Sequence, residues 1–389
     1  MRIKEIVLKN FRCYQDLKID LDEKYTVLIG SNGAGKSTIL DAISIALGGY
    51  ISSFDRLYGI LKDDPHYKMY ELGSKIEREH QFPVEIKINT EIEDKKIRWQ
   101  RELRSEKGKT ANKDIKEISN YAKEIEARVK SGDKTLILPL IAYYGTGRLW
   151  MQKRKKSSLK NAERFSRLKG YVDCLSSASN ERLMLKWFED MTYLELQEGK
   201  RIPELEVVKK AMSQCYKSIN ENIDNVNFIF SMKSKELEII IKHKNGNVEN
   251  LPLRLLSDGA KSTLSMFADI AYRMAVLNPQ LLDEIKEKTP GIVLIDEIDM
   301  HLHPEWQSKI IKDLHEVFPE IQFVFTTHSP TILATVYAKH IRIVSKDGVS
   351  IPVQTTYGRE INSILCQIMD TDVRPKEITE KIAQVEFII

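Results

Sequence analysis

One octapeptide constrains the fold of this chain more than any other stretch of its sequence. Residues 30–37 read Gly-Ser-Asn-Gly-Ala-Gly-Lys-Ser and fit the pattern G-x-x-x-x-G-K-[ST] of a phosphate-binding loop. The apolar run Tyr25–Ile29 before it predicts a buried strand. Residues 38–47 after it have apolar side chains at helical spacing, and Gly48 and Gly49 predict the end of that helix. Strand, glycine loop and helix in this order predict an α/β fold with an anion site at the loop.

The residue types of this loop define its chemistry. Its glycines allow successive backbone N–H groups to curl around a phosphate, and the helix N-terminus adds partial positive charge. We expect the Lys36 ammonium to reach the β- and γ-phosphates of ATP and the Ser37 hydroxyl to bind Mg²⁺. The predicted nucleotide contacts are Ser31, Asn32, Gly33, Ala34, Gly35, Lys36, Ser37 and Thr38.

Two acids follow a second apolar strand, which is predicted at residues 291–295. They form a Walker B arrangement, in which Asp296 holds Mg²⁺ through water and Glu297 polarises the attacking water. A further buried strand is predicted at residues 321–325 and leads to His328. The metal ligands expected from the sequence are therefore Ser37 and Asp296.

A third motif, Ser257-Asp258-Gly259, precedes an amphipathic helix that is predicted to end at Asn278 and Pro279. Serine and glycine at a helix N-terminus form an anion-binding site, although Ser-Asp in this place is also an ordinary helix N-cap. Its position between the phosphate loop and the Walker B strand favours a role in binding nucleotide.

The opening of the chain adds a resemblance to a known family. A strand, the tripeptide Asn10-Phe11-Arg12, a hairpin and the phosphate loop resemble the start of RecF, SMC, OLD and related ABC-type ATPases of the AAA family. The other motifs follow in the order typical of that family. The resemblance implies that Arg12 lies near the phosphates; the alternative is an ordinary surface charge.

The same resemblance implies an assembly. In the family, two subunits pack head to tail, so Ser257, Asp258 and Gly259 would contact the γ-phosphate of the partner subunit's ATP. His328 would sense the γ-phosphate in its own subunit and act beside Glu297 in catalysis. His303 takes the place of an aspartate in the loop that crosses the dimer, and a metal site shared with His301 is the alternative.

The fold class expected from these signals is an α/β, ABC-type P-loop ATPase head with an antiparallel side sheet and a helical insertion. Alternation predicts the side-sheet strands at residues 84–90 and 96–103, and apolar spacing predicts helices at 181–196 and 205–223. Strand-like alternation returns at 226–242. The predicted domains are a first ATPase part at 1–147, a basic helical insertion at 148–225, a second ATPase part at 226–350 and a C-terminal helical tail at 351–389.

Charge is concentrated locally. The formal net charge is only +4, yet residues 148–169 are rich in Lys and Arg with Trp150 and Phe165 interleaved. Such a stretch either contacts the backbone of DNA or RNA or forms a solvated loop. Gln152, in the same stretch, is the nearest glutamine to the place where related ATPases have a metal-binding one.

Composition bounds the environment. The four cysteines (Cys13, Cys174, Cys215 and Cys366) are scattered, which fits a reducing compartment and argues against a zinc site. There is no signal-peptide pattern at the N-terminus and no apolar run long enough to span a membrane, so a cytoplasmic protein without a membrane partner is expected.

The overall layout resembles the PtuA-type ATPases of Septu and retron anti-phage systems. That resemblance implies an ATPase that controls an HNH nuclease, and in retrons also a reverse transcriptase with its RNA–DNA product. A RecF-like repair ATPase on duplex DNA and a nucleotide-dependent scaffold are the alternatives; the intact Glu297 argues against the scaffold. Residues 377–389 predict a helix with an apolar end, and three alternatives are open: the helix continues in the natural protein, its end docks on a partner, or it frays.

Overall fold

The structure of the chain is a computed structural model. It describes residues 1–55, 59–72, 75–93, 95–111, 115–149, 166–176, 181–220, 222–346, 348–372, 374 and 377–378. No helix in this part of the chain combines the length and apolar character needed to cross a lipid bilayer.

A parallel sheet forms the centre of the molecule. Its strands lie in the order β15-β14-β3-β13-β12-β8, and only the edge strand β15 is antiparallel to its neighbour. The strands β8, β12 and β13 are buried along their whole length, as expected for parallel strands covered on both faces. The bounds are β3 Tyr25–Ile29, β8 Leu140–Tyr144, β12 Gly291–Ile295, β13 Ile321–Thr326, β14 Ile341–Ser345 and β15 Gly348–Ser350.

A second, antiparallel sheet has the order β2-β1-β6-β7, and helix α1 (Lys36–Ile51) packs between the two sheets. The strands are β1 Arg2–Phe11, β2 Tyr14–Asp20, β6 Val84–Ile92 and β7 Lys95–Leu103. Trp99 of β7 donates a hydrogen bond to the Ala46 carbonyl at 2.8 Å. A Cβ on Gly49 would lie 3.2 Å from the Trp99 ring nitrogen, so glycine here serves close packing inside the helix.

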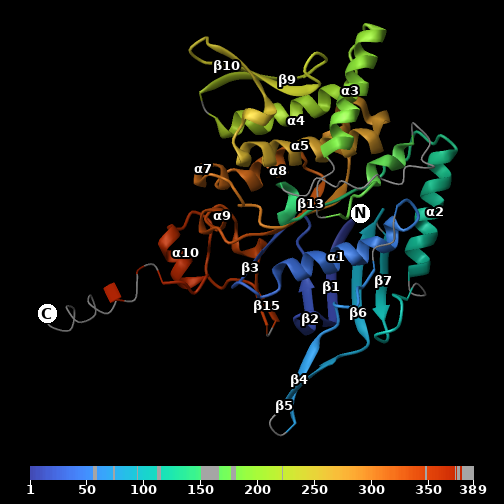
Figure 1. The fold of residues 1–389 in the computed structure, drawn as a ribbon, viewed down its shortest axis with the longest axis vertical. Coiled ribbons are helices and arrows are strands. Elements are labelled where there is room, and N and C mark those ends of the chain that lie inside the picture. Colours follow the sequence, from blue (N-terminus) through green and yellow to red (C-terminus); the bar gives the residue numbers. More distant parts are fainter. Residues whose placement is uncertain are drawn as a thin grey trace.

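Three helices and a small sheet cover the other face of the parallel sheet (Figure 1). Helix α5 packs on β8, α4 packs on α5, and the sheet β11-β10-β9 packs on α4 through β9. The bounds are α3 Glu181–Glu198, α4 Pro203–Ile219, α5 Asp258–Leu277, β9 Ile223–Ser231, β10 Glu236–His243 and β11 Val248–Pro252.

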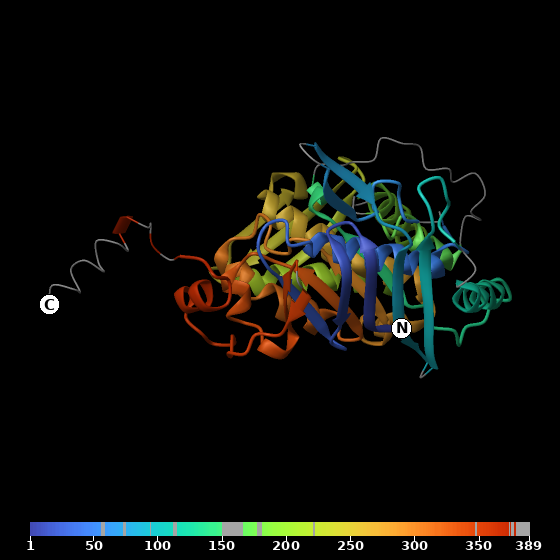
Figure 2. The same ribbon diagram turned by 90° about the horizontal axis from the view of Figure 1, so that it is seen from below.

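The remaining elements lie around this body. The hairpin β4–β5 projects beyond the antiparallel sheet at the end of the molecule opposite α3 and β10 (Figure 1). Helices α2 and α10 lie on opposite sides of the molecule (Figure 2). The hairpin strands are β4 Tyr67–Leu72 and β5 Lys75–His80, and the α-helices are α2 Lys116–Lys130, α6 Ile285–Lys288, α7 Pro304–Gln307, α8 Ile310–Val317, α9 Pro330–Leu333 and α10 Ile361–Gln367. The short 3₁₀ helices, labelled η, are η2 Thr146–Leu149, η3 Arg167–Tyr171, η4 Leu253–Leu255, η5 Pro279–Glu284 and η6 Ala338–His340.

The observed elements correct several predicted boundaries. Helix α1 runs through Gly48 and Gly49, which were expected to end it. The strand-like stretch 226–242 is two strands, β9 and β10, and Ile223 begins β9 instead of ending a helix. The predicted end of α5 at Asn278 is confirmed, because buried Asn278 caps the helix and its side-chain amide donates to the Leu138 carbonyl at 2.9 Å.

Some predictions lie largely outside the described residues. Gln152, most of the basic stretch 148–169 and the tail helix beyond residue 378 are among them. Within that stretch, Arg167 is half-buried and donates to the Leu277 and Leu136 carbonyls, each at 2.7 Å. Its guanidinium therefore binds backbone carbonyls of this chain. The domain limits at 147, 225 and 350 stay a prediction; β8, before the first limit, shares one sheet with β12 and β13.

Candidate functional site

The phosphate loop has the backbone that its glycines predict. Gly30, Gly33 and Gly35 all have positive φ angles, of 152°, 77° and 97°. A Cβ on Gly35 would lie 2.4 Å from the Tyr14 hydroxyl, and one on Gly30 would lie 2.3 Å from a backbone oxygen of β14. The Tyr14 hydroxyl donates to the Ala34 carbonyl at 2.6 Å. The turn between β1 and β2 therefore supports the loop directly, and a side chain at Gly30 or Gly35 would collide with its neighbours, whereas Gly33 has open space and only its positive φ favours glycine.

Lys36 lies inside its own loop. Its ammonium donates to the Gly30 carbonyl at 3.0 Å and to the Ser31 carbonyl at 3.1 Å. Burial lowers the pKa of Lys36, and the nearby carboxylates of Asp296, Glu297 and Asp299 oppose that shift. A buried ammonium whose hydrogen bonds go to neutral carbonyls attracts an anion, which is the property that a phosphate site requires.

The two predicted metal ligands are adjacent. The Ser37 hydroxyl at the start of α1 donates to Asp296 Oδ1 at the end of β12, at 3.0 Å. Mg²⁺ usually keeps several of its waters, so a Ser37 hydroxyl that binds it directly and an Asp296 carboxylate that holds it through water suit the ion. The residues present therefore fit Mg²⁺, which needs only one or two protein oxygens when phosphates supply others. Among the described residues, no cluster of three or more His, Cys, Asp or Glu side chains could hold a metal ion by itself.

Thr326 connects the two acids of the Walker B motif. Its hydroxyl donates to Asp296 Oδ1 at 2.6 Å and accepts a hydrogen bond from the Glu297 backbone N–H at 2.7 Å. Glu297 has a φ of 47°, a left-handed conformation that is uncommon for glutamate. The end of β13 thus fixes the turn in which β12 delivers its acids, and a strained conformation at such a point indicates a functional constraint.

His328 follows the same strand β13, which pairs in parallel with β3 immediately before the phosphate loop. The Thr327 N–H donates to the Leu28 carbonyl at 3.3 Å, and its hydroxyl donates to Asp299 at 2.6 Å. Because the carboxyl ends of parallel strands meet at one edge of a sheet, the fold brings the phosphate loop, Glu297 and His328 to the same edge.

The third motif, Ser257-Asp258-Gly259, which we call the signature, lies at the N-terminus of α5. Ser257 caps this helix by accepting from the Ala260 N–H at 3.3 Å, and Asp258 pairs with Lys261 at 2.8 Å. Both Ser257 and Asp258 are exposed, whereas Gly259 is buried and a Cβ on it would lie 2.2 Å from the His301 carbonyl. The structure therefore presents an exposed helix N-terminus, held by direct contact with the loop that follows Walker B.

The two loop histidines do not form a metal centre with other described residues. His303 is exposed, caps α7, and its Nδ1 accepts from the Glu305 N–H at 3.4 Å. His301 has a φ of 65° and contacts α5 through its backbone. The dimer-contact interpretation of His303 stays a prediction.

Arg12 lies at the β1–β2 turn, which also supports the phosphate loop. Its side chain forms ion pairs with Asp41 of α1 and with Asp64, the latter at 2.8 Å. Sequence reasoning singled out Arg12 but missed these carboxylates, and it also missed Thr326. Thr326 could have been found, because it is a polar residue at the end of the apolar strand that leads to His328.

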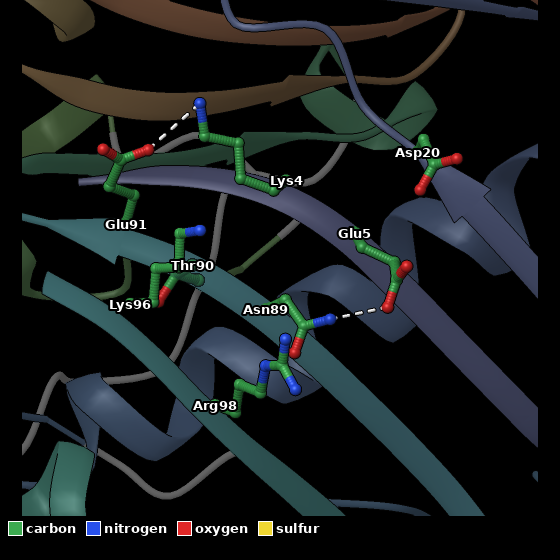
Figure 3. A pocket seen from close by; sticks show the side chains of 8 residues that line it. All are labelled: Lys4, Glu5, Asp20, Asn89, Thr90, Glu91, Lys96 and Arg98. Atoms are coloured by element: carbon green, nitrogen blue, oxygen red, sulfur yellow. Dashed lines mark hydrogen bonds and ion pairs between the residues drawn. The ribbon is translucent and has the colours of Figure 1, made fainter.

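A separate cavity of about 380 Å³ lies on the outer face of the antiparallel sheet, between β1, β2, β6 and β7 (Figure 3). Its lining has three cationic side chains and three anionic ones, namely Lys4, Lys96 and Arg98 and Glu5, Asp20 and Glu91. Lys4 pairs with Glu91 at 3.1 Å, and Glu5 pairs with Lys18 and accepts a hydrogen bond from Asn89. This balance of charge gives the cavity no clear preference for an anion or a cation.

Comparison with known proteins agrees with this geometry. The family model described as "AAA domain" matches residues 5–226, and that described as "AAA ATPase domain" matches residues 147–333. The head of an SMC protein, solved with the C-terminal winged-helix domain of ScpA, superposes with a TM-score of 0.51 at 18% identity and covers 90% of this chain and 97% of that one. That likeness shows the ABC-type ATPase fold.

Several curated proteins are similar over most of the chain. The retron Vc95 probable ATPase of Vibrio cholerae is 27% identical over 98% of this chain and 81% of its own length. The retron Ec83 probable ATPase of Escherichia coli is 28% identical over 97% of this chain and 78% of its own length. The Septu protein PtuA of Bacillus mycoides is 28% identical over 85% of this chain, which spans only 38% of that protein.

Proposed function

The chain belongs to the AAA domain family and is an ATPase, and from this premise we propose that it is the regulatory ATPase of an anti-phage defence complex. In the proposal, two subunits close head to tail around ATP and thereby control a partner HNH nuclease. The similarity to retron and Septu ATPases supports the defence role. The free cysteines fit a cytoplasmic setting.

The chemistry assigned to the site is hydrolysis of the γ-phosphate. Lys36 and the loop amides bind the phosphates, and Glu297 orients and polarises the attacking water. Mg²⁺, held by Ser37 and Asp296, would neutralise the phosphate charge. The single observation that supports this best is the hydrogen-bonded series Ser37–Asp296–Thr326–Glu297, because it joins both predicted metal ligands to the predicted base through a hydroxyl.

Two variants test the hydrolytic site. Lys36→Ala removes the phosphate-binding charge, so ATP binding should be lost in calorimetry. Glu297→Gln keeps size and hydrogen bonding but cannot act as a base, so ATP should bind while turnover falls roughly 100-fold or more. Normal turnover in Glu297→Gln would refute the assigned chemistry.

Regulation of a nuclease requires a separate experiment. The ATPase is co-expressed with an HNH nuclease of a Septu system, and the complex is purified with and without ATP. The proposal expects co-purification and a nuclease activity that differs between wild type and Glu297→Gln. Absence of association, together with ATP turnover stimulated by duplex DNA, would instead support the RecF-like repair function.

A further inference from the structure

The backbone of Arg12 is fixed from both sides. Its N–H donates to the Asp64 carbonyl at 2.6 Å, and its own carbonyl accepts from His66 Nδ1 at 2.7 Å. Arg12 also has a φ of 49°, which is uncommon for a residue other than glycine. The β1–β2 turn thus holds this arginine in a defined place beside the phosphate loop, since the next residues, Cys13 and Tyr14, contact Gly35.

The two carboxylates that bind the guanidinium differ in environment. Asp64 accepts from Arg12 Nε at 2.8 Å and from the Leu61 N–H at 2.7 Å, and its side chain is 3% exposed. Asp41 accepts from Arg12 Nη1, and its side chain is 30% exposed. Asp64 is therefore a buried anchor, whereas Asp41 is a partner that solvent or a ligand can reach.

The Arg12 guanidinium keeps its charge despite its burial. Burial of the guanidinium acts to lower the pKa of Arg12, but hydrogen bonds to Asp64 and Asp41 outweigh it and the pKa is raised. Asp41 has a further partner, because the Tyr143 hydroxyl of β8 donates to its other oxygen at 2.9 Å. Asp41 can lose Arg12 and still keep one hydrogen bond.

We propose that Asp41 is the resting counter-charge of Arg12, and that the phosphates of bound ATP replace it. The planar guanidinium has five N–H donors, so Nε can remain on Asp64 while the Nη groups exchange Asp41 for a phosphate. A partly exposed ion pair contributes little, whereas arginine and phosphate can form two parallel charge-assisted bonds. The inference rests on the function proposed above, and it adds Asp41 and Tyr143 as positioning residues that set ATP affinity.

Calorimetric titration of the purified full chain with MgATP tests this exchange. Asp41→Asn removes the competing charge, so the Kd should fall roughly two- to fivefold. Tyr143→Phe removes the second hydrogen-bond donor of Asp41. The carboxylate then depends on Arg12 alone and competes more strongly with the phosphates, so the Kd for MgATP should rise. Asp224→Asn, which removes a carboxylate from the distant strand β9, is the matched control and should leave the Kd unchanged.

A double variant separates exchange from simple repulsion. In an Arg12→Gln background, Asp41→Asn should no longer tighten binding, because the competition acts through Arg12. The inference is overturned if Asp41→Asn still increases the affinity for MgATP in the Arg12→Gln background. It is also overturned if Asp41→Asn alone binds MgATP no more tightly than wild type. Tyr143→Phe leaves Asp41 in place and gives an independent result if Asp41→Asn fails to fold. Failure of the proposed function looks different: wild type would not bind ATP, or Lys36→Ala would bind it equally well.

Discussion

Thr326 shows how one hydroxyl can set the geometry of two acids. It donates to Asp296 and accepts from the Glu297 backbone, and it is fully buried at the end of β13. A hydroxyl has one hydrogen to donate and lone pairs to accept with, so a single threonine can satisfy both neighbours. Without it, Asp296 would lose a short hydrogen bond and the strained Glu297 turn would lose its support.

Thr326→Ala should therefore lower kcat roughly 10- to 100-fold, the range seen when groups that orient metal ligands are removed. ATP binding should persist, because Lys36 and the loop amides are untouched. Thr326→Ser keeps the hydroxyl and should restore most of the turnover. Steady-state kinetics on the three proteins check this; equal losses in the Ala and Ser variants would indicate a packing role instead.

Strand β8 joins the two halves of the site through consecutive tyrosines. Neighbouring residues on a strand point to opposite faces, and here Tyr143 binds Asp41 of α1 while Tyr144 binds Asp269 of α5 at 2.7 Å. Asp269 also accepts from Arg273 at 2.8 Å, and Arg273 donates to the Gly170 carbonyl of η3. The phosphate-loop helix and the signature helix are therefore both hydrogen-bonded to one buried strand.

Two histidines packed around Tyr25 of β3 give a prediction about pH. Burial lowers the pKa of His340 in η6, despite Asp22 at 3.1 Å, and burial followed by the charge of Lys24 lowers the pKa of His315 in α8. Below the ordinary pKa of 6.5, the unfolded chain then binds more protons than the folded one. Stability should fall as pH drops through 6.5 and level off below the native values.

Urea unfolding between pH 7.5 and 5.5 measures this contribution. A variant with both His315→Gln and His340→Gln should lose less stability over that range than wild type, because two titrating groups are absent. Other titrating groups are common to both proteins and cancel in the comparison. An equal or steeper loss in the double variant would contradict the assignment.

Particular residues show which features of this molecule can be read from local sequence and which depend on the fold. The phosphate loop, Walker B acids and signature are local patterns, so their positions could be read directly. The role of Gly49 could not, because it depends on Trp99 from a distant strand. Asp41 and Asp64 were missed for the same reason: their importance arises only when Arg12 is placed between them.

Both surfaces that the proposal assigns to nucleotide are exposed on the whole molecule. Ser31, Asn32 and Gly33 of the phosphate loop are exposed, and so are Ser257 and Asp258 at the N-terminus of α5. The Ser257 and Asp258 side chains bond only locally, to α5 itself, among the interactions described. A second subunit is the partner that would bring one surface against the other, as the proposed head-to-tail dimer requires.

Mixing two inactive variants tests that assembly. Lys36→Ala has no working phosphate loop but an intact signature, and Ser257→Arg has the reverse. Each alone should be inactive, because every site in its homodimer is damaged. In a mixed dimer, the loop of the Ser257→Arg subunit meets the intact signature of the Lys36→Ala subunit, so one whole site forms and ATP turnover should return. Recovery should increase with total protein concentration, since association is required. A mixture as inactive as its components, or wild-type turnover per subunit that does not change on dilution, would show that each subunit hydrolyses ATP alone.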